Sequence, residues 1–468
     1  MTGAGQLREH LATVVVAALS SWFAATLILF TGILTAAMDP RMVQESATFR
    51  IVLLMVVGIF IVIALYVGAI VTANTFATII AGRLRTIALL RLVGASAARV
   101  RARVASEGLV MGALGSVLGL LLAEGLCLAA VAFGPAWGWL PAGRDYPIFD
   151  PLALGAVVVV VLTTYAAAWV GSRPVGRVSP VEATGAAVEP PAEVAHRRTA
   201  RTVWSIVLLL LGVALIALGL LIGMFSPLGL FISFVGGLSS FTGIALGAHW
   251  VMPPVLALAG RLLERFVGGR PVVRLATANA VRFPDRSARS TIGLVIGVTL
   301  VVMFAVALDS YRAMTLLAFA NDPQLASSLD QTLSITTAIF TGLVGFSAVI
   351  AAVGMVNTLS LGVLQRRREL GLLRALGFTG QQVRRMVVAE SAQMTLAALG
   401  FGLLLGIFYG WVAAQSLLGS QAGLSAPTVP WPVLAGVAVF GVALAAAAAA
   451  APARRAVRMS PMEVLAAE

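Results

Sequence analysis

Residues 365–390 read QRRRELGLLRALGFTGQQVRRMVVAE and lie between two long apolar runs. Leucines recur at three-residue intervals and so share one helical face; they are Leu370, Leu373 and Leu376. Gly377 predicts a helix stop, because glycine adopts the left-handed conformation without a Cβ penalty. Thr379, with Gln382 three residues later, predicts a capping box. The stretch therefore predicts a short arginine-rich helix, a tight turn and a new helix that enters the membrane. By itself it also fits a basic loop bound to anionic lipid headgroups.

The composition is that of a polytopic membrane protein. Of 468 residues, 60% are hydrophobic and only 11% charged, which leaves no room for a large soluble domain. All 32 basic residues are arginine, and a P-loop requires a lysine, so the chain is not a P-loop ATPase by itself. The single cysteine, Cys127, excludes an internal disulfide and a thiolate metal cluster.

Apolar runs of about 20 residues or more predict ten transmembrane helices and an all-α membrane protein. The runs are 11–38, 51–81, 105–133, 150–172, 203–224, 229–259, 289–309, 333–362, 390–419 and 430–451. With the N-terminus inside, all but four of the 32 arginines fall on the cytoplasmic side. This bias predicts a multi-pass protein of a cell membrane, expected to be the bacterial plasma membrane, with both termini cytoplasmic. It also accounts for the net charge of +13 without nucleic-acid binding.

The loops between these runs are short. None of the outer loops approaches the length of a folded domain. The inner segment 174–202 contains Pro190 and Pro191, and its composition predicts a flexible linker. The inner segment 260–288 is rich in arginine and predicts a helix along the inner leaflet.

The stretch at 365–390 has a second copy earlier in the chain. Residues 82–107 read GRLRTIALLRLVGASAARVRARVASE, and a shift of 283 residues aligns the two. A further pair follows, with RVSPVE at 177–182 and RMSPME at 458–463, each beginning a short helix with a serine cap. The chain is thus expected to comprise two parallel four-helix modules, 1–182 and 274–468, joined by a linker and a central two-helix hairpin, 183–273.

These motifs resemble those of the FtsX-like permease family of ABC transporters, across about 51–182 and 274–468. The resemblance implies a separate cytoplasmic ATP-binding subunit, usually a dimer, that carries ATP and Mg²⁺, so no cofactor and no catalysis are expected in this chain. It also implies that the helix after the second span of each module is a coupling helix that docks into this subunit. The residues to which the resemblance assigns docking are Arg366, Arg368, Glu369, Leu370, Leu373, Arg374 and Leu376, and in the first copy Arg83, Arg85, Leu89 and Arg91.

Two differences from the family's pattern limit how far its docking roles can be assigned to this chain. Thr86 and Leu84 stand where the second copy has Glu369 and Arg367, so the second copy is expected to dominate docking. Neither module carries the family's large external domain. We therefore expect an amphiphilic or lipid-like substrate that is reached from the membrane. Export is expected rather than import, because nothing in the sequence suggests a site for a binding-protein partner. The alternative is a non-transporting subunit that relays ATP-driven motion to another protein or acts as a sensor.

Three carboxylates are further candidates. Glu107 and Glu390 occupy equivalent positions where the third and ninth spans leave the cytoplasm. A coupling role would pair them with Arg91 and Arg374; the alternative is an exposed carboxylate at the membrane interface. Glu124 lies inside the third span, where a lipid-facing charge is costly, so it is expected to line a substrate cavity or to be buried for packing. No constellation for catalysis or metal binding is evident.

Overall fold

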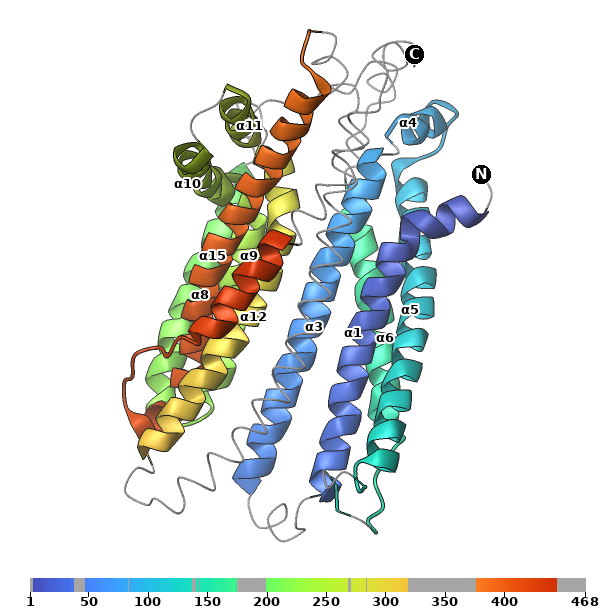
Figure 1. Ribbon diagram of the computed structural model, residues 1–468. Helices are drawn as coiled ribbons and strands as arrows, with labels where there is room; N and C mark the ends of the chain where they lie inside the picture. Colours follow the sequence, from blue (N-terminus) through green and yellow to red (C-terminus); the bar gives the residue numbers. More distant parts are fainter. Residues whose placement is uncertain are drawn as a thin grey trace. The chain divides into compact units, whose positions relative to one another are not determined.

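The computed structural model is all-helical in the part of the chain that it describes, which confirms the predicted all-α class (Figure 1). The described residues are 3–37, 47–82, 84–136, 140–141, 143–173, 175, 199–267, 271–282, 284–318 and 376–443. They divide into two compact units, Met1–Ala187 and Val188–Glu468.

Four long helices and one short one build the first unit. The long ones, α1 (Gly3–Ala37), α3 (Ala47–Gly82), α5 (Ala97–Phe133) and α6 (Pro151–Gly171), lie alongside one another. The short α4 (Leu84–Leu92) lies between α3 and α5 in the chain. Asp150 caps α6, because its carboxylate accepts a hydrogen bond from the backbone N–H of Leu152 at 2.9 Å.

The second unit begins with a tight helical hairpin. Its helices are α8 (Thr199–Gly223), α9 (Gly229–Leu246), α10 (Ala248–Val267), α11 (Pro271–Arg282), α12 (Pro284–Ala318) and α15 (Gly380–Ala422). The hairpin of α8 and α9 packs on α15, where Ser233 and Ser416 share a hydrogen bond of 2.6 Å and Ser240 and Tyr409 one of 2.8 Å. The central hairpin therefore belongs to the second compact unit.

Seven of the described helices are long and apolar enough to cross a membrane. The spans are Thr13–Ile33, Ala97–Phe133, Pro151–Gly171, Ala200–Gly223, Gly229–Leu246, Thr291–Leu317 and Gly380–Gln421. Shorter apolar helical segments occur at Ile61–Ala77, within α3, and at Trp431–Ala443. The predicted span 333–362 lies outside the described residues, so the count of ten stays a prediction.

The predicted sixth span, 229–259, is wrong in its extent. The spanning helix α9 ends at Leu246, Gly247 caps it, and α10 starts a new direction from Ala248. Arg201 stabilises the break, because its Nε donates to the carbonyl oxygen of Leu246 at 2.8 Å. Figure 1 shows α10 and α11 nearly end-on, so they lie crosswise to the long helices of their unit. The apolar composition continues through the break, which is why the sequence suggested one helix.

Glycines bring α5 close to α1 in the first unit and α15 close to α12 in the second. A Cβ on Gly119 of α5 would collide with the backbone of Ala18 in α1 and lie 2.7 Å from the Trp22 nitrogen. At the equivalent position of the repeat, a Cβ on Gly402 of α15 would lie 2.8 Å from the Cβ of Val298 in α12. The two halves therefore share a helix pairing as well as a sequence pattern.

Candidate functional site

A glycine turn of the same form stands before α5 and before α15. Gly94 has a φ of 101° and Gly377 a φ of 95°, the left-handed region that glycine favours. In the first copy the backbone N–H of Ala95 donates to Leu90 and that of Gly94 to Arg91, which is a Schellman motif. The left-handed conformation predicted at Gly377 is thus confirmed, and the first copy shows such a turn at the end of α4. The helix that Gly377 is predicted to end lies, apart from Leu376, outside the described residues.

Each turn is followed by a capped helix. Thr379 and Gln382 form the predicted capping box, with the Gln382 backbone N–H donating to Thr379 Oγ1 at 3.2 Å and the Thr379 N–H donating to Gln382 Oε1 at 2.8 Å. In the first copy Ser96 is the cap, and its hydroxyl accepts from the Arg99 N–H at 3.3 Å. The sequence analysis missed Ser96, although the shift of 283 residues places it on Thr379.

The short helix α4 has an apolar face that the described part of the chain does not cover. Its inner face buries Ile87 and Ala88, and Ile87 packs with Ile80 and Val175. Arg91 is half-buried and donates to the Val175 carbonyl at 3.4 Å. The outer face and the residue directly after the helix expose large side chains by 45% to 90%, namely those of Leu89, Leu90, Leu92 and, in the turn, Val93. We call these four residues the α4 outer patch.

The remaining predicted docking residues are described only in part. Arg85 lies within α4, whereas Arg83 lies outside the described residues. In the second copy, Leu376 precedes the glycine turn and is 72% exposed. The other docking residues of that copy lie outside the described part of the chain: Arg366, Arg368, Glu369, Leu370, Leu373 and Arg374. Leu376 is equivalent to Val93, so both copies expose an apolar side chain directly before the turn.

The start of α5 is fixed to the end of α6 by Arg101. Its guanidinium stacks over the Trp169 ring at 4.4 Å and donates to the Trp169 carbonyl at 3.2 Å. Its Nε also donates to the Ser172 hydroxyl at 3.5 Å. A cation–π contact combined with hydrogen bonds holds the α5 start in one orientation. The turn after α4 is thus attached to a rigid bundle.

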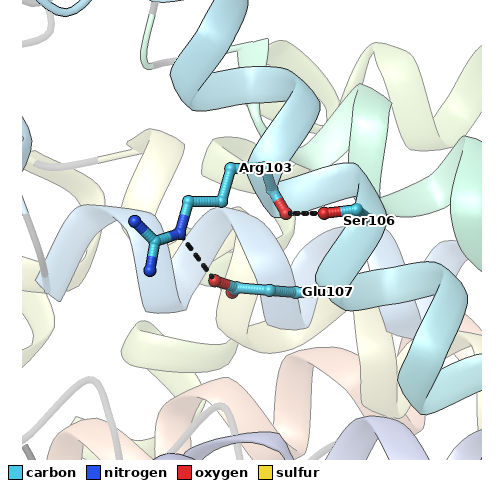
Figure 2. Close-up of polar contacts among 3 residues, drawn as sticks. All are labelled: Arg103, Ser106 and Glu107. Atoms are coloured by element: carbon cyan, nitrogen blue, oxygen red, sulfur yellow. Dashed lines mark hydrogen bonds and ion pairs between the residues drawn. The ribbon is translucent and has the colours of Figure 1, made fainter.

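Glu107 and Glu390 have different surroundings although they are equivalent in the repeat. Glu107 forms an ion pair of 3.7 Å with Arg103, one turn earlier on α5, and the two point toward each other in Figure 2. In α15 the position of Arg103 is taken by Met386, which is buried. Glu390 is itself only 4% exposed, so the alternative of an exposed interfacial carboxylate does not hold for it. The sequence analysis missed the Arg103 partner, which the i,i+4 spacing indicates.

The first turns of α15 are covered by α10 and α11. Val383, Met386 and Val387 pack in a core cluster with Val273 and Ala276 of α11. Gln393 is fully buried, and its Nε2 donates to the carbonyls of Leu256 at 2.8 Å and of Thr277 at 3.5 Å. The helices α10 and α11 therefore pack against the first part of α15, and we call this pair of helices the α10–α11 bracket.

Glu124 lies on α5 with intermediate exposure, next to the buried Ala123. Ala123 packs in the seam that α5 forms with α1 and α6. The substrate-cavity role of Glu124 stays a prediction.

Comparison with known families identifies the repeated part. The model of the FtsX-like permease C-terminal domain matches residues 58–180 and again residues 341–461, together more than half of the chain. The chain belongs to the FtsX-like permease family. The two family matches begin 283 residues apart, the same shift as the internal repeat. The segment between them includes α8 to α12, so the hairpin and the α10–α11 bracket lie outside the family domain.

Curated relatives match over shorter stretches. The chain is 28% identical to the uncharacterized ABC transporter permease YknZ of Bacillus subtilis over 157 residues, which are 34% of this chain and 36% of the relative. It is 30% identical to an uncharacterized ABC transporter permease of Methanocaldococcus jannaschii over 143 residues, 30% of this chain and 36% of the relative. It is 24% identical to the macrolide export ATP-binding/permease protein MacB of Hahella chejuensis over 150 residues, 32% of this chain and 22% of the relative. The matched region thus spans about a third or less of the length of these relatives.

Proposed function

We propose that this member of the FtsX-like permease family is the membrane-spanning permease subunit of an ABC transporter. The observation that carries the proposal is the duplication of the family domain, each copy with an exposed apolar side chain just before a glycine turn. Relatives in this family bear the name ABC transporter permease. ATP and Mg²⁺ would bind to a separate cytoplasmic subunit, expected as a dimer, because this chain has no lysine for a P-loop.

Docking would use the two coupling elements. The α4 outer patch offers leucines to an apolar cleft of the ATP-binding subunit, and α4 is fastened to its own unit through Ile87 and Arg91. A rigid attachment is what a coupling element needs, because motion imposed on its outer face must reach α5. In the second copy the predicted helix 365–376 would bind the ATP-binding subunit. The force that this subunit exerts would then pass to the first turns of α15, against which the α10–α11 bracket packs.

The substrate proposed is amphiphilic or lipid-like and is exported. Long helices such as α8 expose apolar side chains over most of their length, so the lipid phase lies directly against the bundle. The predicted outer loops are too short for a capturing domain, which favours entry from the membrane. Glu124 is the proposed polar contact for such a substrate.

Reconstitution in liposomes tests the proposal. The full chain and its ATP-binding subunit, in vesicles loaded with fluorescent amphiphiles, are expected to move substrate across the bilayer only with hydrolysable ATP. If the chain alters the rate of ATP hydrolysis but no substrate is moved, the result favours the alternative function, in which the chain relays ATP-driven motion to another protein. A chain that neither binds an ATP-binding subunit nor changes its hydrolysis rate would contradict the proposal altogether.

A further inference from the structure

The helix α10 has an outward face that the coupling account does not use. Its inner face buries Met252, Leu256 and Ala259. The outward face carries Leu258, Leu262 and Phe266, which are 59%, 45% and 86% exposed. These residues are four apart, so they form one stripe along the helix. Exposed apolar stripes of this length mark a contact with a membrane or a partner.

Arginines run beside this stripe. Arg261 and Arg265 are both exposed and also four residues apart. The one acidic residue of α10, Glu264, is turned toward α11, where it accepts a hydrogen bond of 2.5 Å from the Thr277 hydroxyl. Within the described residues neither arginine forms an ion pair. The outward face is thus apolar on one side and purely cationic on the other.

The position of α10 in its unit matches the boundary between lipid and water. It follows directly on the spanning helix α9 and runs crosswise to the long helices (Figure 1). Two tryptophans occur at the same level: Trp204 near the start of α8 is 63% exposed, and Trp250 donates from Nε1 to Ser205 of α8 at 3.3 Å. Tryptophan at a helix end is typical of the membrane interface.

We infer that the outward face of α10 binds the anionic headgroups of the adjacent membrane leaflet. Leu258, Leu262 and Phe266 enter the boundary between headgroups and acyl chains, and Arg261 and Arg265 contact lipid phosphates. Because α10 also holds Gln393 through the Leu256 carbonyl, headgroup binding anchors the bracket over the α15 start. A protein partner is less well matched, since α10 begins directly after the spanning helix α9 and its outward face combines exposed apolar side chains with arginines, as expected for a helix at the surface of an anionic leaflet.

A fluorescent reporter on α10 tests this inference. The full chain with Cys127→Ala and Leu262→Cys is labelled with an environment-sensitive dye and placed in nanodiscs of phosphatidylcholine with phosphatidylglycerol. Nitroxide-labelled versions of each lipid are then compared as quenchers. We expect quenching by both, with a preference for phosphatidylglycerol of up to about fivefold for each arginine.

Matched variants distinguish the contribution of the arginine charges from that of the apolar contact with lipid. Arg261→Gln with Arg265→Gln should abolish the headgroup preference while lipid quenching persists. A label at Leu210, 64% exposed in the middle of α8, should be quenched without headgroup preference. The inference is overturned if iodide in the water quenches position 262 and lipid nitroxides do not, or if wild type and the arginine variant show equal preference. It is also overturned if position 262 becomes shielded only when the ATP-binding subunit is added, which would make the face a protein site.

Discussion

At the scale of single residues, Gly119 is where α5 comes closest to α1. A side chain there would collide with the α1 backbone, so Gly119→Ala should lower the free energy of unfolding by about 1–3 kcal/mol. Gly125 on the same helix has open space around its Cβ position and provides the matched control. Thermal unfolding in detergent measures both. Equal melting temperatures for the two alanine variants would contradict the close packing.

The left-handed glycine before α15 permits a second residue-scale prediction. A Cβ on Gly377 would meet no atom within 4 Å, so Gly377→Ala acts only through its φ of 95°. The strain should cost about 1–2 kcal/mol. It should also weaken the turn itself, because alanine disfavours the left-handed conformation that Gly377 adopts. Limited proteolysis near residue 377 should therefore become faster in the alanine variant, and Gly400→Ala, in open space within α15, should leave it unchanged.

At the scale of elements, the bracket of α10 and α11 depends on Gln393. Gln393→Leu removes its hydrogen bonds to the Leu256 and Thr277 carbonyls and should cost about 1–2 kcal/mol. Backbone amides of α10 and α11 should then exchange hydrogen faster. The control is Gln421→Leu, an exposed position near the end of α15. Unchanged exchange in α10 for the Gln393 variant would show that the apolar cluster alone holds the bracket.

Elements with local signals could be predicted from the sequence, and those set by distant contacts could not. The turn at Gly377 and the cap at Thr379 depend on neighbours within a few residues, and both are confirmed. The break between α9 and α10 was missed, because apolar residues continue through it and Arg201, far away in the chain, stabilises it. The burial of Gln393 against Leu256, 137 residues away, has no signal in a single sequence.

At the scale of the whole molecule, the sequence predicts which ends of the helices face the cytoplasm. On a background without Cys127, a cysteine at Asp145 should react with a membrane-impermeant maleimide in intact cells. A cysteine at Ala98, at the start of α5, should react only after permeabilisation. Both positions are exposed, so access to the side chain does not limit the reaction. The reverse pattern would contradict the arginine bias as a guide to topology.

The central claim is that two equivalent coupling elements, of unequal strength, dock an ATP-binding subunit. Leu376 and Val93 occupy the same place before the glycine turn and are 72% and 90% exposed, so replacing either by glutamate should leave the fold intact. The decisive measurement is the affinity of the full chain, in nanodiscs, for its ATP-binding subunit. We predict a loss of about tenfold or more for Leu376→Glu, a smaller loss for Val93→Glu, and none for Leu424→Glu, an exposed control after the far end of α15. Wild-type affinity in both coupling variants would contradict the account.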